Sequence, residues 1–375
     1  MAVYSILAAL LVIGCILERD VHLGIKGKVL AVKKSYSPIY IYYILCCCVM
    51  LAIVALRGDF WTDSYGYSTI FYRTASTPFT EVLKGNSLLT NGDELLFSIL
   101  TKIISYFTDE FAVYCVILAT MTYVPIFFVI AKKSDSPHLS LLIVFTLGFF
   151  FSSFNVVRSC LAYGLATVMV DSIRDCKTIK VVLAAIVLSG IHSSALLFIP
   201  IYFLLQVPLL DRKHIIITFS GMCLFWVLFG EIFKLVDRFL VKGFYSTGYS
   251  GLGIQSGVIG LARPAIFVLG LILLMNGSID WQNPEEKILV NGTLVWCAMG
   301  ITVLQMRLMT RFSDMMFIYP TLLIPRLLFR VDLRISGKEI SKTLIFLGAA
   351  LLLVYRITRI LGDSPFNPYI SCLGR

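Results

Sequence analysis

Charge is what this sequence of 375 residues has least of: 14% of its residues are charged, whereas 58% are hydrophobic. Soluble domains carry roughly a quarter of charged residues. Too little polar surface remains to coat a soluble particle of this size, so the composition excludes a soluble protein. The net charge of +10 comes from short basic clusters between apolar runs. That pattern follows the positive-inside rule of membrane proteins, so we expect no nucleic acid partner.

The sequence also lacks cysteines and histidines at the spacing typical of metal ligands. The chain has 10 cysteines but no CxxC or Cys/His pattern, and most cysteines lie within apolar runs. Cysteine in such runs behaves as a small hydrophobe, so we expect neither a metal site nor a cofactor. The first apolar stretch lacks a basic segment before it and a small-residue cleavage site, which predicts a retained helix. Without internal repeats or a soluble domain, residues 1–375 are predicted to form a single transmembrane domain.

Apolar runs of spanning length are what the chain does contain. A spanning helix needs about 20 mostly apolar residues, and bilayer-crossing strands would leave backbone groups unsatisfied. The sequence therefore predicts an all-α, polytopic membrane bundle of about 10–12 transmembrane helices. Apart from the stretch 180–207, the predicted helices lie near 2–17, 38–56, 111–131, 138–154, 157–173, 214–233, 257–276, 288–306, 312–329 and 342–361.

The stretch 180–207 is too long for one upright helix, and Ser189, Gly190 and His192 interrupt it. We expect two half-helices that meet near His192, a broken or re-entrant helix; one tilted helix is the alternative. The basic segment Arg19–Lys34 is predicted to be cytoplasmic, which places Arg57 on the outer face. Beyond residue 180 the charge rule no longer decides. Two crossings by 180–207 would place Arg326–Lys342 inside and gather the candidate site residues outside.

Two segments differ from the spanning helices. Residues 57–110 form a predicted outer loop, whose amphipathic run Glu94–Phe107 is typical of a helix lying along the membrane interface. Residues 237–256 are rich in Tyr, Gly and Ser. Aromatic groups on such a loop suit contact with sugar rings, so Tyr67, Tyr245 and Tyr249 are candidate glycan contacts. A flexible connector is the alternative for 237–256.

Isolated arginines are the first candidates for chemistry, because the planar guanidinium fork matches phosphate oxygens. Arg57 opens the outer loop, and Asp63 follows six residues later. Asp63 could act as a general base, or the two could form an ion pair that holds the loop. Asn155 and Arg158 lie between two apolar runs. They form either a buried anion site or a helix end that reaches the lipid headgroups.

His192 sits where its helix is interrupted, and a broken helix offers free N–H groups to an anion. The imidazole could take a proton, and a structural hydrogen bond is the alternative. Arg307 and Arg311 lie four residues apart, hence on one helix face. Such like charges repel unless an anion lies between them. The alternatives are a cytoplasmic positive cluster, or Asp314 as a local partner.

Taken in order, these motifs resemble the EpsG family of polysaccharide polymerases, relatives of the Wzy-type O-antigen and capsule polymerases. The resemblance spans most of the chain. It departs from the family where Ser159 stands in place of the more usual Gln. The motifs are LRG-x-x-x-TD-x-x-x-Y (Leu56 to Tyr67), FN-x-x-R-x-x-LA (Phe154 to Ala162), IHSSALLFIP (Ile191 to Pro200), Arg311-Phe312 and Asn367-Pro368-Tyr369.

The resemblance implies a GT-C-like helical architecture in the bacterial inner membrane. It implies an enzyme that extends a surface glycan at the periplasmic or outer face, in contact with membrane lipid. Donor and acceptor would be oligosaccharides on undecaprenyl diphosphate, and a chain-length regulator is a further candidate partner. In this interpretation Arg158 and Arg311 hold the diphosphate, Arg57 or Arg307 assists, and Asp63 or His192 takes the acceptor proton.

Two other functions fit the same features. A related lipid-linked glycosyltransferase or O-antigen ligase would transfer the glycan to another acceptor. A flippase or transporter of the lipid-linked oligosaccharide would also use intramembrane arginines and broken helices. Glycan ladders separate polymerase from ligase, and the leaflet on which the substrate accumulates separates polymerase from flippase.

Overall fold

A computed structural model describes residues 2–24, 38–58, 61, 63–85, 94–209, 214–241, 282–301, 309–330, 334–335, 338–339, 353 and 369–372. Its architecture is all-α, as predicted. The elements near the chain start are α1 (Ala2–Gly24) and α2 (Pro38–Ala55), followed by α3 (Ser64–Ser76), α4 (Phe79–Leu83), α5 (Leu95–Ser105) and α6 (Phe111–Lys133). Next come α7 (Pro137–Leu147), α8 (Phe149–Asn155), α9 (Val157–Ala166), η1 (Thr167–Met169) and α10 (Val170–Arg174).

The second half contains α11 (Thr178–Ser189), η2 (Ser193–Leu197), α12 (Phe198–Gln206), α13 (Ile215–Val241), α16 (Pro284–Ile301), α17 (Met309–Asp314) and α18 (Ile318–Arg330). A two-residue antiparallel pair, β1 (Arg334–Ile335) with β2 (Lys338–Glu339), follows. Residues 237–241 of the predicted loop 237–256 belong to α13, which continues to Val241, and the rest of that stretch lies outside the described residues. The predicted helix 257–276, and all but Leu353 of the predicted helix 342–361, lie outside the described residues.

This is a membrane protein by the length and composition of its helices. In the described residues α2 and α6 are each long and apolar enough to span a bilayer. The pair α7 and α8 makes a third span if it is counted as one, although it bends by 52°. Gly148 causes the bend, because its φ of 109° lies in the left-handed region that favours glycine. The sequence predicted one helix at 138–154 and missed this break.

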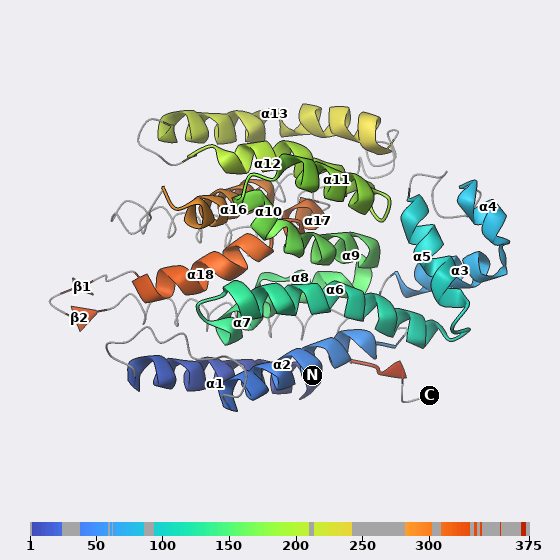
Figure 1. Ribbon diagram of the computed structural model, residues 1–375, viewed down its shortest axis with the longest axis horizontal. Helices are drawn as coiled ribbons and strands as arrows, with labels where there is room; N and C mark the ends of the chain where they lie inside the picture. The colour runs from blue at the N-terminus through green and yellow to red at the C-terminus, as the bar shows by residue number, and fades with distance from the viewer. Residues whose placement is uncertain are drawn as a thin grey trace.

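Most helices lie along one direction, and the short helices α3, α4 and α5 form one end of the bundle (Figure 1). At the opposite end lies the β1–β2 pair (Figure 1). Within the bundle, α1 packs on α2 and α7, α6 packs on α2 and α9, and α16 packs on α12 and α18. The amphipathic run predicted from Glu94 forms α5, which packs on α3 and α4.

The stretch 178–206 forms a helical hairpin, which confirms the predicted broken helix and rules out one tilted helix. Thr178 and Tyr202 share a hydrogen bond of 2.7 Å between their hydroxyl oxygens, and Gln206 Nε2 donates to the Ile173 carbonyl at 2.8 Å. Both ends of the hairpin therefore lie together, and its tip carries His192. The 12 residues of α11 extend about 18 Å, less than the roughly 30 Å hydrocarbon core.

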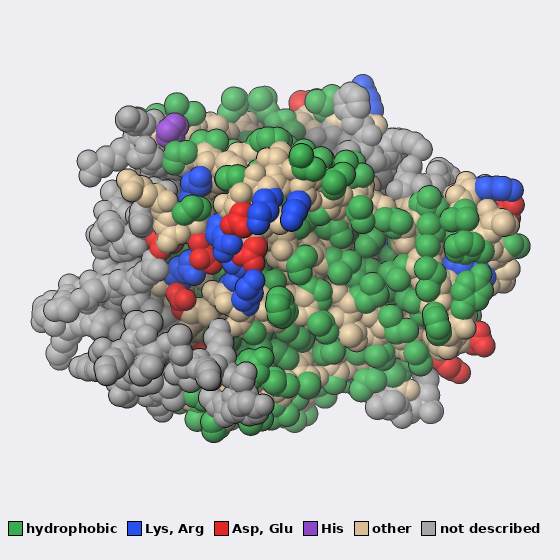
Figure 2. All heavy atoms as spheres, in the orientation of Figure 1, with side chains coloured by type: hydrophobic (Ala, Val, Ile, Leu, Met, Phe, Trp, Pro, Cys, Tyr) green, Lys and Arg blue, Asp and Glu red, His purple; other side chains and the backbone are tan. Residues whose placement is uncertain are grey.

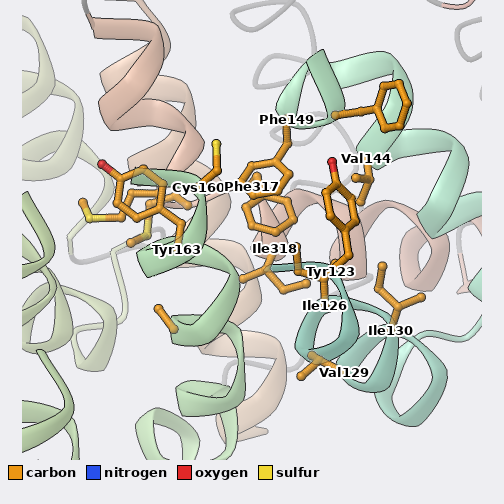
Figure 3. Close-up of a cluster of buried hydrophobic side chains, with 14 of the residues drawn as sticks. Tyr123, Ile126, Val129, Ile130, Val144, Phe149, Cys160, Tyr163, Phe317 and Ile318 are labelled. Atoms are coloured by element: carbon orange, nitrogen blue, oxygen red, sulfur yellow. The ribbon is translucent and has the colours of Figure 1, made fainter. Parts of the chain in front are cut away.

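Close packing of aromatic and aliphatic side chains holds the centre of the bundle together (Figure 3). The Phe149 and Phe317 rings stack with centroids 3.8 Å apart, which joins α8 to the turn before α18. Tyr123 lies beside them and shares a hydrogen bond of 2.8 Å with Ser153. Gly164 lets α9 approach α6, because a Cβ at this position would lie 2.4 Å from the Thr122 carbonyl oxygen.

We expect Gly164→Ala to lower the thermal midpoint of the purified protein markedly. The added methyl group would meet backbone atoms that cannot rotate away, and overpacking a filled core costs about 1–3 kcal/mol. Gly66→Ala is the matched control, because a Cβ at Gly66 meets nothing within 4 Å. A thermal unfolding series in detergent checks this. Equal midpoints for the two variants would contradict the packing described for α6 and α9.

Candidate functional site

Glu94 joins the two most informative polar residues of the sequence. It immediately precedes α5 and is 5% exposed. Its Oε2 accepts a hydrogen bond from Arg158 Nη1, and its Oε1 lies 2.7 Å from His192 Nδ1. A buried carboxylate requires such partners. Arg158 and His192 are 64 and 98 residues away in the chain, so only the tertiary fold assembles this triad of Glu94, Arg158 and His192.

The protonation of the triad follows from its contacts. Burial alone raises the pKa of the Glu94 carboxyl, but the hydrogen bond from His192 and the charge of Arg158 outweigh it, so its pKa lies below the ordinary value. Glu94 is therefore ionised at neutral pH and can only accept hydrogen bonds. His192 must then carry its proton on Nδ1. The neutral imidazole consequently has its lone pair on Nε2, the arrangement of a general base.

Three separate elements bring the triad together. Arg158 lies in the first turn of α9, His192 at the tip of the helical hairpin, and Glu94 at the start of α5. The hairpin tip docks directly on α5, because the Phe97 amide donates to the Gly190 carbonyl at 3.0 Å. A Cβ at Gly190 would lie 2.7 Å from Leu96 Cγ, so glycine permits this approach.

An aromatic row connects the triad to Arg57. The Tyr67 hydroxyl accepts a hydrogen bond of 3.3 Å from the Arg158 amide, and the Tyr67 ring stacks on Trp61 with centroids 5.5 Å apart. The Arg57 guanidinium carbon lies 4.5 Å from the Trp61 ring centroid and 5.9 Å from that of Phe154. Cation–π contact thus stabilises this guanidinium. Arg57 and Arg158 flank the Trp61–Tyr67 stack.

Arg57 is 4% exposed, and its Nη1 donates to the Val54 carbonyl at 2.8 Å. Its buried Nε has no hydrogen-bond partner within the residues that the structure describes. The Arg57–Asp63 ion pair, the alternative suggested by the sequence, is not formed between these two described side chains. The Asp63 backbone carbonyl instead accepts from the Tyr67 amide at 3.0 Å at the start of α3. A buried guanidinium with an open donor suits an anionic ligand.

The other predicted site residues are placed less completely. Asn155 ends α8, half-buried and three residues from Arg158. Arg311 lies on α17, which contacts α8 and α9; the direction of its side chain lies outside the described part. Arg307, Tyr245 and Tyr249 fall outside the described residues. Arg57, Tyr67, Arg158 and His192 are therefore the predicted residues that the fold brings together, with Asp63 at the start of the helix that carries Tyr67.

Comparison with known protein families identifies the chain. The model of the EpsG family matches residues 40–371, which is most of its length. The protein belongs to the EpsG family. No curated protein and no solved structure matches it. Membership supports a general role as a membrane polysaccharide polymerase of the glycosyltransferase type.

Sequence reasoning about this EpsG-family protein missed Glu94. It named Glu94 only as the start of an amphipathic run and gave it no role. A signal was available, since a carboxylate stands immediately before an otherwise apolar helix in the outer loop. The partners of that carboxylate could not be inferred from spacing, because they come from α9 and the hairpin tip, which are distant in the sequence.

A second charged cluster lies at the opposite end of the bundle. Helix α6 starts with Phe111, whose ring stacks on Trp61, and ends at Lys133, whose Nζ lies 2.5 Å from Asp171. Its 23 residues separate the two ends by about 35 Å. We call them the Glu94 end and the Lys133 end. Figure 2 shows the acidic and basic side chains of the Lys133 end gathered on one part of a largely apolar face.

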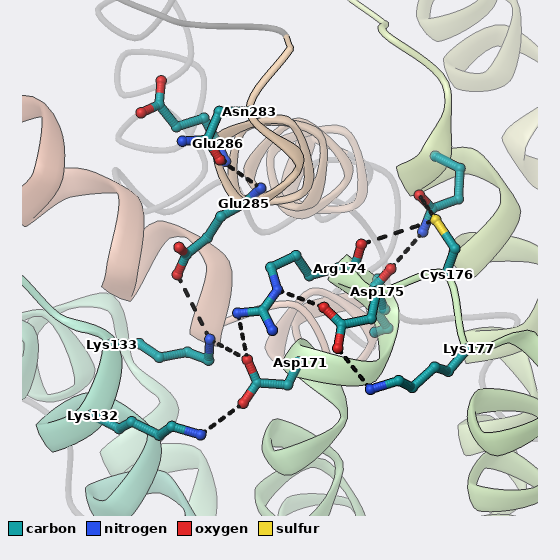
Figure 4. Close-up of polar contacts among 12 residues, drawn as sticks. Lys132, Lys133, Asp171, Arg174, Asp175, Cys176, Lys177, Asn283, Glu285 and Glu286 are labelled. Carbon is teal, nitrogen blue, oxygen red and sulfur yellow. Dashed lines mark hydrogen bonds and ion pairs between the residues drawn. The ribbon is translucent and has the colours of Figure 1, made fainter.

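Ion pairs connect four helices at the Lys133 end, and Figure 4 shows those among α6, α10 and α16. Arg174 contacts Asp171 at 2.8 Å, and Lys133 approaches Glu285 at 3.6 Å. Arg326 of α18 lies 3.5 Å from Glu285. Hydrogen bonds from Arg174 and Lys177 lower the pKa of nearby Asp175 to about 2. The cluster lines a cavity of about 630 Å³. Because opposite charges meet there throughout, its evident role is to tie α6, α10, α16 and α18 together.

We expect Asp171→Asn to lower the thermal midpoint by about 2–6 °C at low ionic strength. The substitution leaves Lys133, whose side chain is 7% exposed, without its nearest carboxylate. Asp109→Asn is the control, since Asp109 is exposed and the described residues provide it with no ion pair. Thermal unfolding at two salt concentrations measures the effect. An unchanged midpoint would mean that the network does not stabilise the bundle.

Proposed function

We propose that this protein is a polysaccharide polymerase that joins oligosaccharide repeat units carried on undecaprenyl diphosphate. The growing chain on one lipid carrier is the donor, and the next lipid-linked unit is the acceptor. The observation that carries the proposal is the buried Glu94 carboxylate, which holds Arg158 and His192 together, with the buried Arg57 on the other side of the Trp61–Tyr67 stack. Two cations and an oriented imidazole at one end of a membrane bundle suit transfer from a lipid diphosphate.

The reaction requires both parts of the site. The acceptor hydroxyl oxygen forms a bond to the anomeric carbon of the donor, and the bond from that carbon to the diphosphate breaks. The electron pair leaves with the diphosphate, whose growing charge the guanidinium groups of Arg57 and Arg158 stabilise. The hydroxyl proton passes to His192 Nε2, while Glu94 holds the Nδ1 proton and stabilises the imidazolium.

Arg158 can serve Glu94 and substrate together. Its guanidinium has five N–H donors, and the side chain is 25% exposed while that of Glu94 is 6% exposed. Arg158 is therefore the more open partner of this ion pair, and a ligand can approach its guanidinium from that side. His192 is the better base because its Nδ1 is already held. Asp63, at the start of the helix that carries Tyr67, is the second candidate base. Arg311, on a helix beside α8, and Arg307 are further candidates for the diphosphate.

The proposed location is the bacterial inner membrane, with the site facing the periplasm or exterior. Lys132, Lys133 and Arg326 lie at the Lys133 end, opposite the triad. The positive-inside rule favours placing that basic end in the cytoplasm. The hairpin supports the same orientation, since both its ends lie beside Ile173 and only its tip reaches Glu94.

A glycan ladder from cells that lack the protein tests the proposal. We expect loss of long chains, with single repeat units accumulating on the lipid carrier in the outer leaflet. Assembled chains that stay unattached to their final acceptor would indicate a ligase instead. Units stranded on the cytoplasmic leaflet would indicate a flippase. Either of those two outcomes contradicts a polymerase.

A further inference from the structure

A segment near the end of the chain pairs with the backbone on both sides of Arg57. The Gly58 amide donates to the Ile370 carbonyl at 2.8 Å, and the Cys372 amide donates to the Leu56 carbonyl at 3.0 Å. Arg57 and Ser371 form the antiparallel bridge between these two hydrogen bonds. We call residues 369–372 the brace. It fixes the backbone of Arg57, although more than 300 residues separate the two segments.

Tyr369 anchors the brace to the first two helices. Its hydroxyl donates to the Ile53 carbonyl at 2.9 Å, in the last turn of α2. Its ring lies edge-on to Tyr4 of α1, with centroids 5.9 Å apart. Tyr4 in turn contacts Phe151 of α8, with centroids 5.6 Å apart. The brace thus connects the end of α2 to the helices that surround the Glu94 end.

The brace also completes the end of α2. The last carbonyls of a helix have no partner within it and must find one elsewhere. Here three donors satisfy these carbonyls. The Tyr369 hydroxyl donates to Ile53, the Arg57 side chain donates to Val54, and the Cys372 amide donates to Leu56. Without the brace two of these carbonyls would lose their donors. Arg57 would then be free to change its backbone direction and leave Trp61.

Glycine fits closely where the two segments meet. A Cβ at Gly58 would lie 3.0 Å from the Ile370 carbonyl oxygen and 3.3 Å from Ile370 Cγ2. A side chain at position 58 would therefore require the brace to shift by a few tenths of an ångström. This gives a physical reason for the Arg57-Gly58 pair in the sequence: the arginine supplies the charge, and the glycine admits the brace that orients it.

We propose that residues 369–372 are a positioning element that holds the Arg57 guanidinium ready for the lipid diphosphate. This inference rests on the proposed function. The brace touches no substrate itself and acts only through Arg57. Disturbing it should therefore weaken diphosphate binding by way of Arg57 and leave the Glu94, Arg158 and His192 triad intact.

The test measures binding of undecaprenyl diphosphate to the purified full chain in detergent. Tyr369→Phe removes the hydroxyl that bonds Ile53, and Cys372→Pro removes the amide that bonds Leu56. We expect each to raise the Kd by about three- to tenfold, and Arg57→Ala to raise it by about tenfold or more. Tyr4→Phe is the matched control, because the buried Tyr4 hydroxyl has no hydrogen-bond partner in the described residues.

Combining the variants separates positioning from general stability. If the brace acts through Arg57, Tyr369→Phe should have no further effect on the Kd in an Arg57→Ala background. Hydrogen exchange of the peptide 53–61 should also quicken in both brace variants, because a loosened brace holds the Ile370 carbonyl less firmly against the Gly58 amide. The proposed role of the brace is overturned if the Tyr369→Phe and Arg57→Ala effects on the Kd are additive. It is also overturned if the brace variants match the wild type in hydrogen exchange and in binding. In both cases the proposed function still stands. Failure of the wild-type protein to bind undecaprenyl diphosphate overturns both.

Discussion

Glu94→Gln is expected to lower the rate of chain extension by about 10³–10⁴-fold, the largest effect of any substitution in this protein. The amide keeps the shape of the carboxylate but can donate to His192 Nδ1, which moves the imidazole proton to Nε2. A base with its proton already in place cannot accept another, and fixing the wrong tautomer of a catalytic histidine costs about this much elsewhere. The variant also loses the charge that faces Arg158.

Rates measured on purified protein with a lipid-linked repeat unit check this prediction. We expect the loss in kcat rather than in KM, because proton transfer occurs in the transition state. Glu81→Gln is the matched control, since the partly exposed Glu81 of α4 pairs with the exposed Lys84 that follows this helix. Activity of Glu94→Gln within tenfold of the wild type would exclude Glu94 from the proton path.

The stability effect of Glu94→Gln has a defined pH dependence. Because the pKa of Glu94 in the folded protein lies below its ordinary value of 4.5, the ionised carboxylate stabilises the fold at all pH values above 4.5. That contribution disappears as the pH falls through the lower folded value. The wild-type advantage in thermal midpoint should therefore shrink as the pH falls below 4.5.

Arg158→Ala is expected to abolish long chains while leaving folded protein in the membrane. The guanidinium stabilises the charge that develops on the diphosphate, and removing one such preplaced donor costs about 10²–10³-fold in rate. Arg158→Lys should recover only part of the activity, because an ammonium group keeps the charge but lacks the planar fork. Gel analysis of glycan ladders, with lipid-linked single units measured in the same extract, shows both results.

Two controls separate function from folding in the Arg158 experiment. Arg174→Ala removes an arginine that, like Arg158, forms ion pairs with carboxylates. Its partners are Asp171 and Asp175, which lie at the Lys133 end. It should leave chain length unchanged. The double variant Glu94→Gln with Arg158→Met removes both charges of the pair, so no buried charge is left uncompensated. It should regain stability relative to Arg158→Ala but remain inactive. Wild-type chain lengths from Arg158→Ala would refute its assignment.

Local sequence patterns predicted the helices and the break at His192. The apolar runs at 38–55 and 111–133 are long enough to define α2 and α6. The cluster of Gly190 and His192 with neighbouring serines marked the hairpin tip. The break at Gly148 escaped prediction, because both flanking segments are apolar and a left-handed glycine leaves hydropathy unchanged.

The site was predicted only in part, because its contacts are non-local. Scarcity of charge singled out Arg57, Arg158 and His192, and the charge rule with the hairpin placed them at one end. Glu94 escaped because its partners come from α9 and the hairpin tip, whose proximity to α5 depends on the whole bundle. The Arg57–Asp63 ion pair, which the sequence left open as an alternative, does not form between these two described side chains. The Arg57 guanidinium turns back to Val54 and Trp61, away from Asp63.

The most direct test of the account is an experimental structure of the protein with undecaprenyl diphosphate bound. We predict that the two phosphates lie at the Glu94 end, in contact with the guanidinium groups of Arg57 and Arg158, and within reach of an acceptor positioned at His192. Phosphates bound at the Lys133 end, or bound away from both of these arginines, would contradict it.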